Sequence, residues 1–341
     1  MKKYLVTVMA VLAAIAIAMP VHAAPAKAKP GKKIKIGVSL PTQRDERWVR
    51  DAQKMKDVAK EEGVDLRMQI CDNDASKQMS QCENLLAQGI DILILAPHDA
   101  TSAAAIVENA KAAGLKVISY DRLVLDADVD LYVSYDNFEV GRLMGEYLVN
   151  KVPKGSYAVF AGAPTDNNAK LYREGALSMI KPLADKGDIK IVMDQWITDW
   201  QPTIAMNLMQ NALTANKNRI DAVVAPNDNT AGGIIQALSG VGLAGKVPVT
   251  GQDAEDTAAQ RIIQGTQAMT VFKDTKQQAV DAIHAAIKMV NGGDPGATSR
   301  VNNRKKDVPS ILLKPVVVDR SNIDDVLIKS GYITREEAYK K

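Results

Sequence analysis

The chain has few of the residues that enzymes and nucleic-acid-binding proteins commonly use. Its 341 residues include only 3 histidines and 2 cysteines, and aromatic residues make up 4%. The 43 Lys and Arg residues nearly balance the 40 Asp and Glu residues, and no basic cluster alternates with aromatic side chains. We therefore expect neither nucleic acid nor an anionic membrane surface as a partner. A small molecule or a specific protein is the expected partner.

The scarcity of histidine leaves nucleophilic catalysis and metal binding without recognisable residues. Apart from His22 near the amino end, the chain has only His98 and His284, which lie far apart and in no nucleophile or metal motif. His284 falls within a predicted helix. His98 follows a predicted strand, and a place on the rim of a cleft is the less favoured interpretation for it. We expect no enzymatic activity, no cofactor and no metal.

The amino end has the composition of an export signal. Lys2 and Lys3 precede an apolar run over 4–19, and a cleavage-like Val-His-Ala sequence follows it. The run is shorter than the roughly 20 residues that a membrane-spanning helix needs. We predict a cleaved signal peptide over 1–23, a flexible tether over 24–33 and a location in the periplasm. No cysteine near the predicted cleavage site offers a lipid anchor.

The two cysteines leave two alternatives open. Cys71 ends a predicted strand, and Cys82 lies in the helix predicted to follow it. An exported protein can keep a disulfide, but a bridge requires Cα atoms within about 7 Å of each other. A disulfide and two buried free thiols are therefore equally compatible with the sequence.

Two stretches match cofactor motifs only in spelling. The Gly-Val-Gly-Leu-Ala-Gly stretch at 240–245 follows a predicted helix and precedes a strand, whereas a dinucleotide turn requires the reverse order. The acidic stretch at 126–130 begins like a calcium loop, but Leu131 replaces the turn glycine and Asn137 replaces the closing Glu. We interpret the first stretch as a loop that ends a helix and the second as a solvated turn.

Short β-rich runs alternate with amphipathic runs throughout the chain. This alternation is typical of parallel sheets covered by helices on both faces, so the predicted fold class is α/β. In the first half, strands are predicted over 34–39, 65–70, 92–96, 117–120 and 132–133, and helices over 47–62, 77–88 and 100–113. After residue 137 the pattern begins again, with strands over 157–161, 190–195, 222–225, 247–251 and 269–272, and helices over 138–150, 171–183, 202–213 and 230–238.

The restart of the pattern predicts two similar lobes. A helix over 277–290 is expected to return to the first lobe, and 311–318 to the second, so several chain crossings would form a hinge. The predicted lobes are 34–136 plus 274–308 and 137–273 plus 309–333.

Polar and aromatic residues follow the predicted strands of both lobes. Because ligands of open parallel sheets bind beyond the carboxyl ends of the strands, these residues should meet in one cleft. They are Arg47, Trp48, Asp121, Arg122, Asp166, Asn168, Trp200, Asn227, Asp253 and Lys273. Indole rings can stack on the flat faces of a sugar ring, and the ionic and amide groups can bind its hydroxyls. The set indicates a cleft for a polar small molecule, and it does not by itself name the ligand.

Single members of this set and their neighbours have simpler explanations. An Asp or Asn after a strand is more often a helix N-cap than a ligand, and this reading is favoured for Asp228 or Asn229 ahead of Thr230. Trp196 can also be explained as a core residue, and Trp48 as a half-exposed packing residue. The evidence for a ligand-binding cleft therefore comes from the whole set, whose members fall at the same edge of both lobes.

The chain resembles the periplasmic sugar-binding proteins of ABC importers from about Ile34 to Ile333. The stretches that carry the resemblance are Glu46-Arg47-Trp48, Ser119-Tyr120-Asp121-Arg122, Asp166-Asn167-Asn168-Ala169-Lys170-Leu171, Asp194-Gln195-Trp196, 211–216, Gly251-Gln252-Asp253 and Asp307-Val308-Pro309-Ser310. The resemblance implies a type I periplasmic-binding-protein fold with two Rossmann-like lobes, a three-strand hinge and closure around a monosaccharide. D-xylose is the first choice of ligand, and ribose, arabinose and glucose are the alternatives.

The resemblance also implies roles and partners. Each residue of the strand-end set would contact the sugar, with Trp48 and Trp200 as stacking plates and Lys170 as a weaker addition that would equally suit a helix cap. The implied partners are an ABC permease and a chemoreceptor, and the implied state is a monomer. The effector domain of a repressor is the alternative from another class. It would need a DNA-binding segment where the predicted export signal stands.

Overall fold

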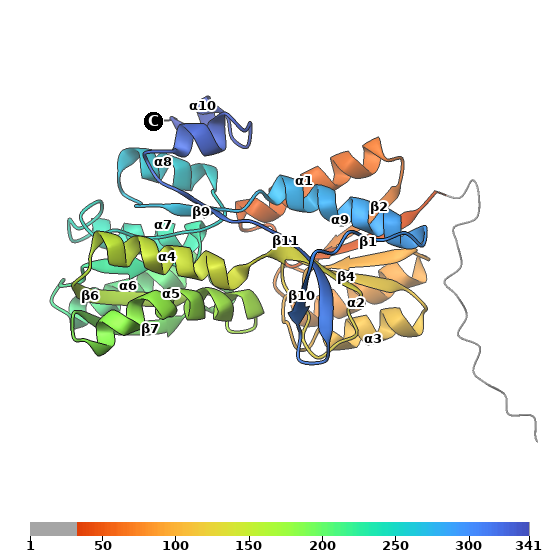
Figure 1. Cartoon of the computed structure of the whole chain (residues 1–341), viewed down its shortest axis with the longest axis horizontal. Coiled ribbons are helices and arrows are strands. Elements are labelled where there is room, and N and C mark those ends of the chain that lie inside the picture. Colours follow the sequence, from red (N-terminus) through yellow and green to blue (C-terminus); the bar gives the residue numbers. More distant parts are fainter. Residues whose placement is uncertain (1–32, 341) are drawn as a thin grey trace, which may run out of the picture.

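The computed structural model describes residues 33–340 and shows two α/β lobes side by side along the long axis of the molecule (Figure 1). The predicted α/β class is confirmed. The predicted signal peptide, and the predicted tether up to residue 32, lie outside the described residues. Within 33–340, no helix combines the length and the apolar character needed to cross a membrane.

The first lobe is built on a seven-stranded sheet. Its strand order is β10-β11-β5-β4-β3-β1-β2, and all neighbours are parallel except the β10–β11 pair. The strands are β1 (Lys35–Leu40), β2 (Asp65–Ile70), β3 (Ile92–Leu95), β4 (Lys116–Tyr120), β5 (Leu131–Tyr135), β10 (Ser299–Asn302) and β11 (Asp307–Leu313). Strand β3 is buried at every position, as expected of a central parallel strand with helices on both faces.

Helices cover both faces of this sheet. They are α1 (Glu46–Glu61), α2 (Ala75–Ala87), α3 (Ala104–Ala112) and α9 (Thr275–Val290). Ile92 and Ile94 pack with α1 and α9 on one face, whereas Leu93 and Leu95 pack with α2 and α3 on the other. This alternation follows from the two-residue period of a strand.

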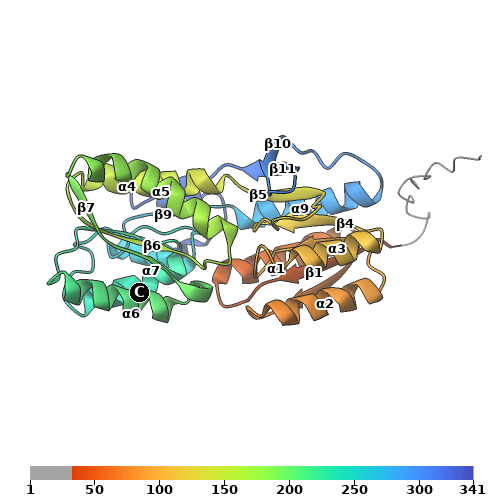
Figure 2. The ribbon, with the colours of Figure 1, turned by 90° about the horizontal axis from the view of Figure 1, so that it is seen from below.

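The second lobe, which contains β6 and β7 in Figure 2, has a smaller parallel sheet. Its strand order is β7-β6-β8. Its elements are α4 (Asn137–Lys151), β6 (Gly155–Ala161), α5 (Asn167–Asp185), β7 (Ile189–Trp196), α6 (Pro202–Ala215), β8 (Ala222–Val224) and α7 (Asp228–Ser239). Helices α4 and α5 cover one face, and α6 and α7 the other. An antiparallel pair, β9 (Thr270–Phe272) and β12 (Val316–Val318), adjoins helices α8 (Asp256–Gln264) and α10 (Arg335–Ala338).

The carboxyl-terminal part of the chain differs from the prediction. Residues 311–318 form two strands, because Pro315 separates them and lacks the N–H that a sheet ladder needs. Strand β11 pairs in parallel with β5, so residues 309–313 belong to the sheet of the first lobe, and their predicted assignment to the second lobe is wrong. Strand β12 does lie in the second lobe.

Other local features of the structure also differ from the prediction. Residues 247–251 form no regular strand, because Val249 makes only an isolated bridge to Val223. Helix α8 and strand β10 were not predicted.

Of the two alternatives left open for the cysteines, the structure shows the second: Cys71 and Cys82 are buried free thiols. Burial raises the pKa of the Cys82 thiol to about 11.

Three segments connect the two lobes. The chain passes from β5 into α4, returns from β9 into α9, and passes again from β11 to β12. Figure 1 shows these segments running together between the lobes. Such a connection lets two packed lobes rotate against each other by changes in a few backbone angles.

Candidate ligand-binding site

A small cavity lies between the lobes, beyond the carboxyl ends of the strands. It is lined by Asp45, Arg47, Trp48, Asp121, Arg122, Asp166, Asn168, Tyr172, Trp200, Asn227, Gln252, Asp253 and Lys273. The structure therefore brings together every residue of the predicted strand-end set. Asp45, Tyr172 and Gln252 were not predicted, and Lys170 is not part of the lining.

The fold explains why these side chains converge. Arg47 and Trp48 lie in the first turn of helix α1 after β1, Asn168 lies in the first turn of α5 after β6, and Lys273 directly follows β9. Parallel strands point all their carboxyl ends at the same edge, so the loops and helix starts of each lobe face the other lobe.

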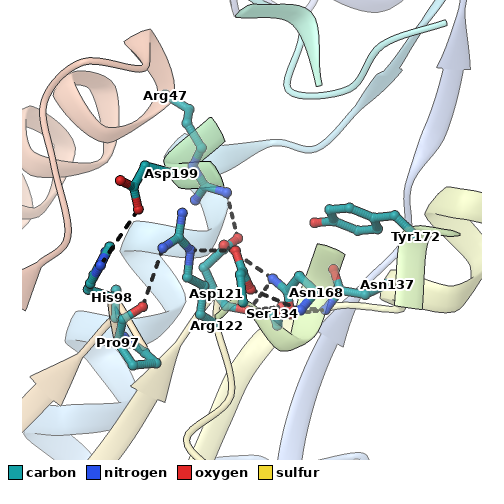
Figure 3. Close-up of polar contacts among 12 residues, drawn as sticks. Arg47, Pro97, His98, Asp121, Arg122, Ser134, Asn137, Asn168, Tyr172 and Asp199 are labelled. Atoms are coloured by element: carbon teal, nitrogen blue, oxygen red, sulfur yellow. Dashed lines mark hydrogen bonds and ion pairs between the residues drawn. The ribbon is translucent and has the colours of Figure 1, made fainter. Parts of the chain in front are cut away.

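Arg47 forms the ionic centre on the side of the first lobe (Figure 3). Its guanidinium is buried and lies 2.5 Å from an oxygen of Asp121 and 2.6 Å from an oxygen of Asp51. Burial by itself would raise the pKa of Asp121, but Arg47 and Lys273 lower it to about 2. Asp121 is therefore a carboxylate at neutral pH and can accept hydrogen bonds from a ligand.

The backbone of Asp121 is held in an unusual conformation. Its φ of 57° lies in the left-handed region, which non-glycine residues seldom adopt. Its carbonyl oxygen accepts hydrogen bonds from Tyr132 (2.8 Å), Ser134 (2.7 Å) and Asn168 (3.0 Å), as Figure 3 shows in part. Because Asn168 belongs to the second lobe, this network also joins the lobes. Strained residues held by surrounding bonds are typical of functional sites.

Two further cations pair with carboxylates in the cavity. The Nε of Arg122 lies 2.8 Å from an oxygen of Asp166 in the opposite lobe, and burial raises the pKa of Asp166 more than Arg122 lowers it. Lys273 is buried, with its Nζ 2.9 Å from Asp253 and 3.2 Å from the Tyr172 hydroxyl. Opposite charges that alternate in this way reduce the cost of burying each one.

Two indole rings come from opposite lobes. Trp48 is buried, and the Arg47 guanidinium carbon lies 4.3 Å from the centre of its ring. Trp200 is 5% exposed and packs edge-on to Tyr172. Trp48 is therefore not half-exposed. Trp196, 38% exposed, is not a core residue.

Gly162 makes room for the ring of Trp200. A Cβ atom at position 162 would lie 2.1 Å from the indole, so only glycine lets the ring lie against this part of the backbone. The backbone of Asp199 and Trp200 is left-handed, with φ of 51° and 57°. The turn at Asp199 and Trp200, together with Gly162, therefore fixes the position of the indole in the cavity.

The cap of helix α7 is Asn227, one residue earlier than predicted. Its side-chain oxygen accepts from the Thr230 N–H at 3.0 Å, and Asn227 also lines the cavity. Asn229 instead donates to Asp45 across the lobes at 2.6 Å, and Asp228 is buried behind the cavity. The expected cap at Asp228 or Asn229 is therefore wrong, because helix α7 already begins at Asp228.

Lys170 and His98 lie outside the cavity. The Lys170 side chain is 65% exposed and pairs with Glu174, because the cavity side of helix α5 carries positions 168 and 172. The predicted contact at Lys170 is therefore not supported by its position. His98 lies 3.9 Å from Asp199 at the margin between the lobes, and burial together with Arg122 lowers its pKa (Figure 3).

The site offers ionic, amide and aromatic groups. Among residues 33–340, no group of three or more His, Cys, Asp or Glu side chains is arranged to hold a metal ion. What the lining can do is bind: carboxylates accept, cations donate, amides do both and indole faces stack.

Known proteins share this architecture. Residues 36–294 match the family described as "Periplasmic binding protein domain". The chain is 45% identical to the D-xylose-binding periplasmic protein of Escherichia coli, over 90% of this chain and 93% of that protein, and 44% identical to the D-xylose-binding periplasmic protein of Haemophilus influenzae, with the same coverage. A solute-binding protein from Chloroflexus aurantiacus, solved in complex with D-glucose, is 35% identical with a TM-score of 0.85 and covers 90% of this chain and 98% of its own. This chain belongs to the periplasmic binding protein family.

Proposed function

We propose that this chain is a periplasmic receptor that encloses one monosaccharide between its lobes and delivers it to an ABC importer without changing it. The observation that carries the proposal is the lining of a single buried cavity by two indoles from opposite lobes and by alternating cations and carboxylates. Neither lobe alone supplies this set.

The chemistry of a pyranose suits this lining. The flat C–H faces of the ring can stack on Trp48 and Trp200, and its equatorial hydroxyls point outward into the ionic rim. Charge-assisted hydrogen bonds to Asp121, Asp253 and Lys273 are shorter and stronger than bonds between neutral groups. The cavity is small and its lining residues are buried, which favours a single sugar unit.

D-xylose is the ligand we propose. Two relatives at 45% and 44% identity are D-xylose-binding periplasmic proteins, and their similarity extends over 90% of this chain. Glucose is the second candidate, because the Chloroflexus aurantiacus protein and a 31% identical protein from Clostridium phytofermentans were both solved with it. The two sugars differ by one hydroxymethyl group, so the free space near C5 of the ring decides between them.

Binding is coupled to closure of the lobes. In this structure the lobes touch through polar contacts such as the Ala100 N–H donating to the Thr165 carbonyl at 2.9 Å. A sugar that contacts both lobes stabilises this closed arrangement relative to an open one, because the open form offers only part of the contact set. The closed surface would then dock on the permease.

The location and partners are part of the proposal. The predicted signal peptide and the names of the two relatives support the periplasm. An ABC permease, a chemoreceptor, a monomeric state and the absence of catalysis are implied by the family resemblance.

Calorimetric titration of the full processed chain with D-xylose, ribose, arabinose and glucose tests the proposal. We expect D-xylose to bind most tightly, and labelled D-xylose to be recovered unchanged after prolonged incubation. Lys170→Gln is the matched control, because it removes an exposed charge close to the site but outside the cavity, and it should bind like the wild type. No binding of any sugar would refute the receptor function, and a converted sugar would refute the absence of catalysis.

A further inference from the structure

We propose that Asp228 is a positioning residue that holds the segment 252–255, and with it Asp253, in its ligand-binding conformation. This inference rests on the proposed sugar-binding function and assigns to Asp228 a role other than helix capping or ligand contact.

Asp228 stands directly behind the cavity. It follows Asn227, which lines the cavity, but its own side chain is 0% exposed and is absent from the lining. Its backbone N–H donates to the carbonyl of Gln252 at 3.1 Å, and its carboxylate accepts from the N–H of Glu255 at 3.1 Å. The beginning and the end of the segment 252–255 are thus attached to the same residue.

The segment between these attachments is strained. Asp253 has a φ of 99° and Ala254 a φ of 52°, backbone angles that residues other than glycine seldom adopt. The Asp253 carboxylate nevertheless reaches Lys273, 2.9 Å away, and so depends on this conformation. Strained residues persist only where surrounding bonds determine them, so the bonds that hold the segment also determine where Asp253 points.

Thr270 connects the middle of the segment to Asp228. Its hydroxyl accepts from the Ala254 N–H at 3.3 Å and donates to the Asp228 carboxylate at 2.8 Å. The Asp253 N–H donates to the Val271 carbonyl at 3.0 Å. Every backbone N–H from 253 to 255 therefore has a partner, and two of these bonds lead to Asp228.

The remaining carboxylate oxygen is also held. Gln267 donates to it at 2.7 Å, and a Cβ atom at Gly251 would lie 2.0 Å from it. Three donors, from Glu255, Thr270 and Gln267, thus face two oxygens. A carboxylate accepts all three, whereas an Asn side chain would turn an NH₂ group toward one of the donors. The ionised form of the Asp228 side chain therefore matches all three donors.

The cost of burying this acid supports a specific role. Burial, with a contribution from nearby Asp253, raises the pKa of Asp228 to about 7, although Arg261 acts in the opposite direction. An apolar residue at the start of α7 would avoid that cost, but it could not bind the segment 252–255.

A double-mutant cycle between Asp228→Asn and Asp253→Asn tests the inference, with D-xylose affinity as the readout. If Asp228 acts through Asp253, Asp228→Asn should weaken binding about tenfold in the wild type and less than about twofold in the Asp253→Asn background. An equal loss in both backgrounds would overturn the inference. Ile189→Ala, a core change at the far end of β7, is the control for lost stability and should leave the affinity of the folded protein unchanged.

Thr270→Val provides a second variant if Asp228→Asn does not fold. It removes the hydroxyl between Ala254 and Asp228 but keeps the shape of the side chain, and it should show the same non-additive pattern with a smaller loss. Amide hydrogen exchange of the sugar-free protein separates this inference from the proposed function. Faster exchange at 253–255 in either variant supports positioning even if no sugar binds, and unchanged exchange in both variants contradicts it.

Discussion

Glu46 of helix α1 accepts a hydrogen bond from the backbone N–H of Asp256, at 3.1 Å, so a side chain of the first lobe caps helix α8 of the second. Helix α8 has no side-chain cap of its own. Arg50 bonds to the carboxylates of both Glu46 and Asp256 and donates to the carbonyl of Ala254 at 3.1 Å. These contacts join the lobes outside the cavity, and a separation of the lobes would break them.

Removal of the inter-lobe contacts of Arg50 should weaken binding of every sugar by the same factor. Arg50→Gln should lower each affinity about tenfold, because the closed form loses inter-lobe bonds and Arg50 itself does not line the cavity. Calorimetry with the sugar panel measures the factor, and small-angle scattering reports closure. Arg142→Gln is the control, because Arg142 pairs with Glu139 and Glu146 within one helix. A change in selectivity among sugars would contradict this interpretation.

The stacking role of Trp200 predicts a large loss of affinity on truncation. Trp200→Ala should weaken D-xylose binding about 30-fold or more, as expected for a buried aromatic residue at the centre of a binding site. Trp196→Ala removes an exposed indole from the same stretch of chain and should bind normally. Equal affinities for the two variants would show that Trp200 is not a stacking plate. Titration calorimetry distinguishes the outcomes.

Gly162 should be needed for affinity rather than for folding. Gly162→Ala places a methyl group 2.1 Å from the Trp200 ring, so the ring must move and sugar binding should fall at least tenfold. Gly240→Ala is the matched control, because the nearest neighbour of its added Cβ atom is the Ala237 carbonyl oxygen at 3.4 Å. Gly240 ends helix α7 with a helical φ of −59°, so this variant should bind D-xylose normally and be more stable by about 0.4–1 kcal/mol. Normal binding by Gly162→Ala would contradict the proposed packing.

The buried acid Asp228 predicts a pH dependence of stability. Its pKa of about 7 lies above the ordinary value of 3.8, so the folded state holds a proton that the unfolded state has lost. The stabilisation of the folded state by this proton is complete below pH 4 and is lost as the pH rises to 7. The stability difference between wild type and Asp228→Asn should therefore shrink by about 4 kcal/mol at most between pH 4 and 8. Urea denaturation at several pH values measures it, and a constant difference would contradict the shifted pKa.

Much of the fold follows from local patterns. The alternation of β-rich and amphipathic runs is a property of neighbouring residues, and it predicted the parallel sheets and most of the helices. The strand-end rule placed Arg122 and Asp166 at one edge although they are distant in sequence. Tyr172 was missed, yet its position four residues after Asn168 places it on the same face of α5. That spacing also excludes Lys170.

The remaining features depend on which segments become neighbours. The assignment of β11 to the first sheet depends on pairing with β5, more than 170 residues earlier, and no local pattern encodes that choice. The free thiols depend in the same way on distances that the sequence leaves open.

The amino-acid sequence by itself determined the α/β class and the residues that end each strand, because periodicity and turn chemistry act over a few positions. The tertiary structure decided which side chains pair with each other. Arg47 pairs with Asp121, Lys273 pairs with Asp253, and Asp228 lies behind the cavity rather than in it. The reason is that ion pairs and hydrogen bonds require separations of about 3 Å, and only the packing of the two lobes brings distant segments that close.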